Sequence, residues 1–416
     1  MRASGGVAPR TAKILLAAVV LLSVVLRLGF VATLDEDLYW PDPRHYDRVA
    51  WRMASGEPLG SAVIRAPFQA FVMAVPYSIA GHSYRAAYVF QALLGGLIPL
   101  LLFLIGTRLR GYGVGLVAAL LSAVYPYYVY ISGALYATQT TTILLLLVVY
   151  LAVRASQTKG LAPLVLQGIA LGALILTRSI AFVLVPVSLL WGWQKHGLGR
   201  ALIVGLVAVA TVAPWTVRNC VVTGEFIPVS VGGGREFLVG VAPGATGSSQ
   251  TRTPLPEGVK ELRFTMGEME WDRYCFSRGL EYASAEPGRY LHLYAAKFLN
   301  LYRFYPKTMT SNEFTGSRTT WISLLTYGPV LLLAIAGLWI ERRRWKDYLP
   351  PLGAVAGFSL VYPAFTTCVR YRLPIDAYLI LFAAVAVGAL ATRISGRLAW
   401  FFASGAPDGA RHSDRS

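Results

Sequence analysis

Long apolar runs alternate with short polar links over most of this chain. A helix of about 20 apolar residues crosses the hydrocarbon core of a bilayer, so we read ten of these runs as membrane spans. They cover residues 13–33, 85–107, 113–131, 138–153, 161–177, 180–194, 200–217, 321–340, 348–366 and 375–393. A shorter run at 67–80 contains Pro76 and is predicted to be a helix lying at, or dipping into, the interface. The pattern predicts an all-α polytopic membrane protein.

Basic residues gather in every second link between the predicted spans. The cytoplasmic links of membrane proteins are enriched in Lys and Arg, so these links predict a cytoplasmic N-terminus and C-terminus. The residues concerned are Arg108, Arg110, Arg154, Lys159, Lys195, Arg200, Arg342, Arg343, Arg344, Lys346, Arg393 and Arg397. The first run is long for a signal peptide and is not followed by an A-x-A site, so we expect a retained span.

Three polar segments then fall on the extracytoplasmic side, at 34–66, 218–320 and 366–374. The second is predicted to be a mostly irregular outer region with one amphipathic helix in "PGRYLHLYAAKFLNLYRFYP", whose Tyr and Arg content suits the headgroup layer. The predicted organisation is an N-terminal transmembrane module (1–217), this outer region (218–320), C-terminal transmembrane helices (321–395) and a disordered cytoplasmic tail (396–416).

Composition supports a membrane protein. Only 14% of the 416 residues are charged and 55% are hydrophobic, whereas soluble domains carry about 25% charged residues. The net charge of +17 resides in the basic links, not in a basic stripe interleaved with aromatics, which argues against nucleic-acid binding. Cys220, Cys275 and Cys368 lack metal-ligand spacing, and we expect free thiols, with a Cys220–Cys275 disulfide as the alternative.

The polar segment "YWPDPRHYDRVAWRMASGEP" follows the first predicted span. Asp42 before Pro43 predicts the start of a helix that ends near Gly56. Tyr46 and the apolar residues at helical spacing after it form one face, with Asp42 at its tip, while Asp47 is expected to face water or headgroups. Asp42 is therefore either a helix cap or a carboxylate presented toward the protein.

Six short motifs along the chain together resemble those of a known superfamily. They are D-x-x-x-Y (42–46), A-x-x-x-A-x-G (50–56), "VIRAPF" (63–68), "LTRSIAFVLVP" (176–186), "APWTVRNCVVTGEFIPVSVGGGREFLVGVAPGATG" (213–247) and "RYRLPIDAYL" (370–379). In order, over about residues 20–395, they resemble the GT-C glycosyltransferases that use polyprenyl-phosphate sugars, which include protein O-mannosyltransferases and lipid A aminoarabinose transferases.

The resemblance implies an inverting hexosyl or pentosyl transfer to a lipid, glycan or protein hydroxyl at the outer face of the plasma membrane. The family's catalytic base falls on Asp42, and we expect an apolar wall to raise its pKa. Pro43 stands where relatives have Glu, which leaves Asp35, Glu36 and Asp37 as alternatives. Gln139 stands where many relatives have a carboxylate. We therefore expect no cofactor, and the motif does not support a divalent metal.

The departing lipid phosphate needs cations, and arginine binds phosphate through two parallel hydrogen bonds. The candidates at the predicted outer face are Arg65, Arg178, Arg218, Arg370, Arg372 and Lys297. Arg178 and Arg218 lie at the outer ends of spans against the usual charge bias, so each requires an anionic partner. Tyr46 and Tyr371 are placed to stack on a sugar ring, or belong to the aromatic belt.

A polyprenyl-lipid transporter or flippase is the alternative function. It would explain many spans with scattered arginines, but the sequence has no inverted repeat and its polar residues concentrate on one side. A non-catalytic scaffold is a further alternative. An acyl- or phosphotransferase would require His45, His82 or His292 as a base. The sequence favours the glycosyltransferase.

Overall fold

A computed structural model describes residues 9–35, 37–38, 41–60, 63–247, 255–304, 317–394 and 401–402. Within these ranges every regular element is a helix and no strand is present, which confirms the predicted all-α class. The tail predicted to be disordered, 396–416, lies outside the described residues except for 401–402.

The helices follow one another closely, and short 3-10 helices are labelled η. The N-terminal module contains α1 (Pro9–Ala32), α2 (Pro41–Ser55), α3 (Phe68–Ala80), α4 (Tyr84–Gly95), α5 (Leu97–Arg110), α6 (Tyr112–Ala123), α7 (Pro126–Tyr130), η1 (Ile131–Gly133), α8 (Ala137–Ser156), α9 (Ala162–Thr177), η2 (Ser179–Val183), α10 (Leu184–His196) and α11 (Leu198–Thr223). The remainder contains α12 (Gly233–Val241), α13 (Val259–Leu262), α14 (Glu268–Ala285), α15 (Pro287–Leu301), α16 (Ser317–Glu341), η4 (Arg342–Tyr348), α17 (Leu349–Val361), η5 (Tyr362–Ala364) and α18 (Val369–Ile394).

The described part of the chain has six helical stretches long and apolar enough to cross a membrane, or up to seven if the bent pair α6–α7 is one span. They are Arg10–Ala32, Tyr84–Arg110, Ala137–Ser156, Leu198–Thr223, Thr320–Ala364 and Val369–Ile394. The chain is therefore a multi-pass membrane protein. Helices α9 and α10 are shorter than a full membrane span. The count of ten spans therefore stays a prediction.

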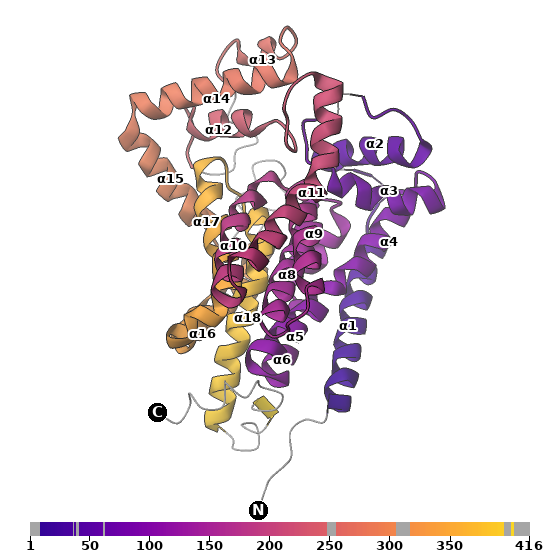
Figure 1. Ribbon diagram of the computed structural model, residues 1–416, viewed down its shortest axis with the longest axis vertical. Coiled ribbons are helices and arrows are strands. Elements are labelled where there is room, and N and C mark those ends of the chain that lie inside the picture. The colour runs from indigo at the N-terminus through magenta and orange to yellow at the C-terminus, as the bar shows by residue number, and fades with distance from the viewer. Residues whose placement is uncertain are drawn as a thin grey trace, which may run out of the picture.

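Helix α18 forms the centre of the bundle. In its apolar window 83% of the residues are buried, against 17% for α1, which lies at the side of the bundle (Figure 1). Helices α6, α8 and α16 pack around α18. The outer helices α1, α11 and α16 expose large apolar side chains such as Leu21, Leu206 and Leu332. Exposed apolar surface of this extent indicates a lipid environment.

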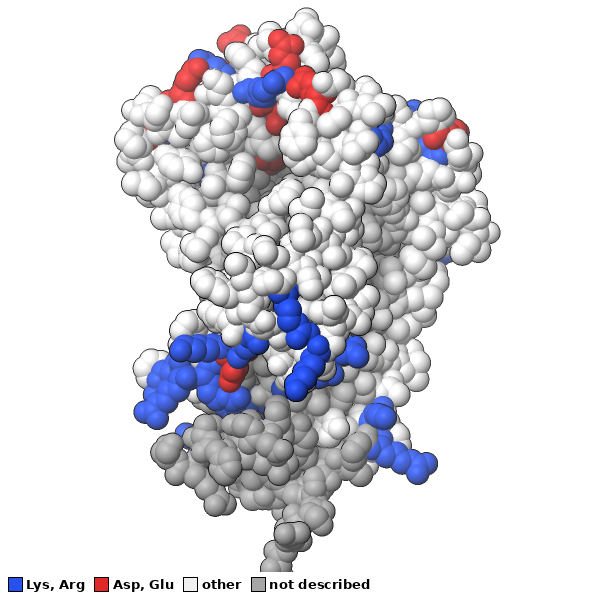
Figure 2. Space-filling model, in the orientation of Figure 1, with Lys and Arg blue, Asp and Glu red and all other residues white. Residues whose placement is uncertain are grey.

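Charged residues lie mainly at the two ends of the molecule. Figure 2 shows mainly Lys and Arg toward one end of the bundle and a mixture of acidic and basic residues at the opposite end, over the region of α13 and α14. Ion pairs and hydrogen bonds tie the helix ends together at the basic end, including Arg110–Glu341 and Arg108–Gln157. This uneven distribution is the pattern that the basic links predicted.

The outer region differs from the prediction. Residues 218–304 are not mostly irregular, because α12, α13, α14 and α15 form a helical cap at one end of the bundle (Figure 1). The predicted amphipathic helix is confirmed as α15. The unforeseen α14 buries Trp271, Cys275 and Gly279, one residue from each turn. Such a narrow apolar face in a highly charged segment gives only a weak signal in the sequence.

The three glycines at 232–234 lie at the start of helix α12. Gly232 caps α12 with φ +117°, a conformation that favours glycine. A Cβ on Gly234 would lie 1.9 Å from the Asp272 carbonyl oxygen. Glycine is therefore required here because α12 packs directly against α14.

The predicted helix after the first span is confirmed as α2, and Gly56 ends it with φ +74°. The expectation for Asp47 was wrong. Its carboxylate is buried and accepts hydrogen bonds from Tyr77 Oη at 2.7 Å and from His82 Nε2 at 2.8 Å. These contacts fix α2 against α3, because a buried carboxylate needs hydrogen-bond donors.

We expect Gly337→Ala to destabilise the bundle. A Cβ at Gly337 would lie 1.9 Å from the Phe382 carbonyl oxygen, so α16 would have to move away from α18. Overpacking of this kind costs about 1–3 kcal/mol. Gly328→Ala is the matched control on the same helix, because its nearest neighbour, Phe304, lies 3.6 Å away. Thermal unfolding of the purified protein in detergent tests this, and equal melting temperatures for the two variants would contradict it.

Candidate active site

Asp42 lies between two arginines from distant parts of the chain. Its Oδ1 accepts a hydrogen bond from Arg65 at 2.7 Å, and its Oδ2 accepts one from Arg370 at 3.2 Å. Asp42 is in the first turn of α2, Arg65 precedes α3, and Arg370 is in the first turn of α18. The carboxylate is 27% exposed, so it is partly shielded from water. The described hydrogen bonds of the Asp42 carboxylate are therefore made with the two arginines and not with backbone amides of α2.

The pKa of Asp42 differs from the expectation. Burial acts to raise this pKa, but the positive charges of Arg370, Arg65 and Arg178 outweigh burial and lower it below its ordinary value. The predicted rise was therefore wrong. The reason is that three guanidinium groups, not an apolar wall alone, surround the carboxylate.

Arg178 completes the group of cations. Its guanidinium lies over the ring of Tyr371, with Cζ 4.9 Å from the ring centroid. Its terminal nitrogens make only long contacts of 3.4 Å, with Tyr362 Oη and Thr138 Oγ1. Its Nε is buried without a hydrogen-bond partner among the described residues. Arg178 is consequently the cation of the cluster that is best able to accept a further anionic partner.

Aromatic rings line the arginines. Arg370 Cζ lies 3.9 Å from the ring centroid of Tyr136 and 5.5 Å from that of Tyr371. Arg65 Cζ lies 6.0 Å from the ring of Tyr46, which is buried in α2. Such rings stabilise guanidinium groups while leaving their N–H donors free in the plane. The six residues Asp42, Tyr46, Arg65, Arg178, Arg370 and Tyr371 form the carboxylate–arginine cluster.

Helix α8 points its N-terminus at this cluster. Tyr136 precedes its first residue and contacts Arg370, and Thr138 contacts Arg178. The positive end of a helix dipole adds to the local positive potential. Neither Tyr136 nor Thr138 was singled out from the sequence, since tyrosines and threonines are common at the ends of spans.

Gln139 of α8 is buried within the bundle. It donates to the Gln91 carbonyl at 2.5 Å and accepts from Ser132 Oγ at 2.9 Å. The neighbouring Thr140 donates to Gln69 Oε1 on α3 at 2.6 Å. This buried network is satisfied by neutral amides, so a second carboxylate is absent at this position.

Glu236 of α12 is an acidic residue near the cluster that the sequence did not single out. Its Oε2 accepts a hydrogen bond from Thr366 Oγ1 at 2.8 Å, in the segment that leads into Arg370. At the start of α12, Val231 N donates to the Val63 carbonyl at 2.8 Å, next to Arg65. Helix α12 is therefore attached to both segments that carry the arginines bound to Asp42.

Two predicted cations, Arg218 and Lys297, lie outside the carboxylate–arginine cluster. Arg218 lies over Trp215 and hydrogen-bonds the Gly60 carbonyl and Asn219 Oδ1. Lys297 is buried on α15 beside Gly240, and its Nζ has no partner among the described residues. No described contact joins either residue to the carboxylate–arginine cluster.

Arg372 turns away from Arg370. Residues two apart on a helix do not face each other, so only Arg370 reaches Asp42. Arg372 is fully buried and pairs with Asp376 one turn later, with Nε 2.9 Å from Oδ1. Tyr125 Oη donates to Asp376 Oδ2 at 2.9 Å. The opposite charges of Arg372 and Asp376 therefore balance each other inside the bundle.

The alternative bases are placed differently. Asp37 Oδ1 accepts a hydrogen bond from the amide of Leu38 at 2.6 Å, and Glu36 lies outside the described residues. Burial, with the charges of Arg65 and Arg48, lowers the pKa of His45 to about 4. The His45 imidazole is therefore neutral at physiological pH. His82 is bound to Asp47, as described above.

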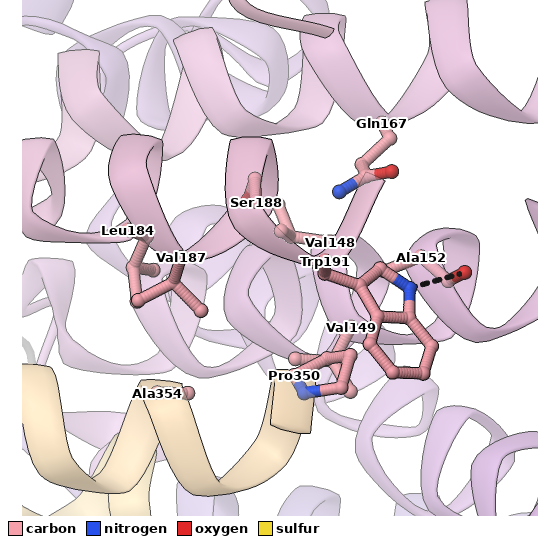
Figure 3. Close-up of a pocket in the computed structure, with 10 residues that line it drawn as sticks. All are labelled: Val148, Val149, Ala152, Gln167, Leu184, Val187, Ser188, Trp191, Pro350 and Ala354. Atoms are coloured by element: carbon pink, nitrogen blue, oxygen red, sulfur yellow. Dashed lines mark hydrogen bonds between the residues drawn. The ribbon is translucent and has the colours of Figure 1, made fainter. Parts of the chain in front are cut away.

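No group of three or more His, Cys, Asp or Glu side chains suited to a metal ion occurs in the described ranges. The three cysteines are free thiols, as expected. A cavity of about 10 Å³ lies between α8, α9, α10 and α17, lined by Gln167, Ser188 and Trp191 (Figure 3). This volume is near the lower limit for one water molecule, so the cavity does not admit a lipid tail.

Comparisons with known proteins support this architecture. Residues 64–217, less than half of the chain, match the family model described as dolichyl-phosphate-mannose-protein mannosyltransferase. An oligosaccharyltransferase from Archaeoglobus fulgidus in the apo form superposes with a TM-score of 0.59 at 16% identity, over 93% of this chain and 51% of that one. The chain has the GT-C fold. The fold that the motifs implied is thus confirmed.

The same archaeal enzyme with an inhibitory peptide and a dolichol-phosphate gives a TM-score of 0.58 at 15% identity, over 95% of this chain and 52% of that one. ArnT from Cupriavidus metallidurans bound to undecaprenyl phosphate gives 0.45 at 18% identity, over 93% and 80%. No curated protein sequence matches the chain. The chain spans about half the length of the archaeal enzyme.

We expect Lys297→Met to stabilise the protein at pH 7. Burial lowers the pKa of Lys297 from 10.5 to about 8, so the folded state binds fewer protons than the unfolded chain between pH 8 and 10.5. Wild-type stability should therefore rise with pH across this window. The variant should gain up to about 3 kcal/mol at pH 7 and progressively less above pH 8.

Thermal unfolding from pH 7 to 10.5 measures this, with Lys260→Met at an exposed position as the control. Lower stability of Lys297→Met at every pH would contradict the prediction and indicate an anionic partner for Lys297.

Proposed function

We propose that this protein is a membrane glycosyltransferase that moves a sugar from a polyprenyl phosphate to an acceptor hydroxyl on the extracytoplasmic side, with inversion. The observation that carries the proposal is the carboxylate–arginine cluster, in which one partly buried carboxylate faces three guanidinium groups. This arrangement supplies a base and a phosphate site at one place.

In the proposed reaction the acceptor oxygen attacks the anomeric carbon of the donor sugar. Asp42 takes the hydroxyl proton, and the bond from the anomeric carbon to the phosphate oxygen breaks with its electron pair on that oxygen. The single displacement inverts the configuration of the sugar. A positioned general base contributes about 10²- to 10⁴-fold to such a step.

The charges of the cluster suit the leaving group. Three guanidiniums and one carboxylate leave two net positive charges. The donor phosphodiester carries one negative charge, whereas the departing phosphate monoester carries close to two at pH 7. The cluster therefore complements the charge that develops during the reaction better than the charge of the donor.

The proposed sidedness follows from the charge distribution. If the basic end of the bundle faces the cytoplasm, as positive-inside asymmetry requires, the cluster and the α12–α15 cap lie on the opposite side of the plasma membrane. Both termini are then cytoplasmic. The exposed apolar helix faces around the bundle would contact lipid, including the isoprenoid tail of the donor.

The comparisons support the proposed substrates. The matching family model is named for transfer from dolichyl-phosphate mannose, and a structure of the archaeal enzyme holds a dolichol-phosphate. We propose a hexosyl or pentosyl donor on a polyprenyl phosphate, an acceptor hydroxyl of a lipid, glycan or protein, and no resident cofactor.

We expect Asp42→Asn to reduce transfer by at least about 100-fold, because the amide cannot accept the acceptor proton. Asp37→Asn is the matched control in the preceding loop and should retain near-normal activity. The assay follows sugar transfer by the reconstituted protein from a panel of undecaprenyl-phosphate mannose, glucose and arabinose. Near-normal turnover of Asp42→Asn would remove Asp42 as the base, and loss of activity in Asp37→Asn would restore the alternative.

We expect Arg178→Gln to weaken donor binding. A hydrogen bond to a charged group is worth about 1.5–3 kcal/mol, which corresponds to a loss of roughly 10- to 100-fold in affinity for undecaprenyl phosphate. Arg218→Gln, outside the cluster, is the matched control and should bind normally. Equal affinities of the two variants, measured by titration in detergent, would contradict the assignment of Arg178.

A further inference from the structure

Both oxygens of the Asp42 carboxylate are bound by arginine in this structure. Arg65 holds Oδ1 and Arg370 holds Oδ2, so each oxygen accepts a charge-assisted hydrogen bond from a different element. A carboxylate held in this way is a weak base, because each guanidinium stabilises its ionised form. An acceptor hydroxyl would have to bind an oxygen that already accepts a hydrogen bond from a guanidinium.

The third arginine differs from these two. Arg178 makes no described hydrogen bond to Asp42, and its Nε has no described partner. A phosphate can therefore bind Arg178 first, while Asp42 is still held by Arg65 and Arg370. From there the phosphate oxygens can compete for the other two guanidiniums.

We propose that Arg65 and Arg370 keep Asp42 inactive until the donor phosphate binds them and releases the carboxylate. This inference rests on the proposed function and concerns the regulation of that site. It requires the donor to bind before the acceptor hydroxyl is deprotonated. The trigger is a lipid-linked phosphate, because its oxygens are the groups that can replace a carboxylate on guanidinium.

Helix α12 is placed to keep the two arginines in position during this exchange. Val231, two residues before α12, donates to the carbonyl of Val63, two residues before Arg65, and Glu236 on α12 accepts from Thr366 before Arg370. The carboxylate belongs to a different helix, α2, which is attached to α3 through Asp47. Arg65 lies three residues before α3, to which α2 is attached, whereas Arg370 belongs to α18, so Asp42 and Arg370 are held by different parts of the bundle.

The proposal has a consequence for product release. Free polyprenyl phosphate carries more negative charge than the donor, so it should hold the arginines more firmly. Asp42 would regain both contacts only after this product departs. The clamp of Arg65 and Arg370 on Asp42 thus re-forms once per reaction cycle.

The charged and titratable groups facing Asp42 come from five elements or segments. They are Arg65 before α3, Arg178 before η2, Arg370 on α18, Tyr136 before α8, and Tyr46 and His45 on α2. The arginines lower the pKa of Asp42 in the free enzyme. When a phosphate shares these arginines, their effect on Asp42 weakens and its pKa rises.

The dependence of rate on pH tests the proposal. The acid limb of kcat/KM for the donor reports groups in the free enzyme, and that of kcat reports groups in the complex. With undecaprenyl-phosphate mannose, glucose or arabinose as the probe, whichever is transferred, we expect the kcat limb to lie at least about one pH unit higher, a tenfold difference in proton affinity. Arg65→Gln should move the kcat/KM limb upward and narrow the gap, whereas Arg218→Gln should leave the gap unchanged.

The outcomes separate the two proposals. Coincident acid limbs in an active enzyme would overturn the clamp and leave the glycosyltransferase in place. A gap that persists unchanged in Arg65→Gln would also overturn it. Absence of transfer from every donor in the panel would overturn the proposed function and the clamp together.

Discussion

The site depends on a single carboxylate shared by two guanidinium groups. Asp42 joins the first turn of α2 to the segment before α3 and to the first turn of α18. Near a membrane such an arrangement is costly to break, because each member would leave an unpaired charge partly shielded from water. The other features of the site, including the aromatic rings and the attachment of α12, surround this interaction and keep its members within reach of one another.

Two clusters of Arg and Asp occur along α18, and their charge balance separates their roles. Arg372 and Asp376 form a fully buried pair, supported by Tyr125, whose charges cancel. The cluster around Asp42 has three arginines for one carboxylate and is partly exposed. A balanced buried pair holds helices together, whereas an excess of cations at an accessible place favours an anionic ligand. Their arginines are only two residues apart in sequence.

The helical cap is attached to the segments that carry the arginines of the candidate site. Helix α12 packs so closely against α14 that only glycine fits at position 234, and it contacts the segments carrying both arginines. A cavity of about 640 Å³ lies in this cap, lined in part by Arg235 of α12, Lys260 of α13 and Trp271 of α14.

The sequence by itself determined the class of protein, the positions of the apolar runs, the charge asymmetry and the family resemblance, and it drew attention to Asp42 and its arginines. These features depend on local composition and short motifs. Only the tertiary structure decided that Arg370 and not Arg372 meets Asp42, that Asp47 is buried, that Lys297 has other neighbours, and that the outer region is helical. It also reversed the expected pKa of Asp42. These outcomes arise from contacts between residues up to 328 positions apart, which hydrophobic periodicity cannot encode because it describes only neighbours along one helix.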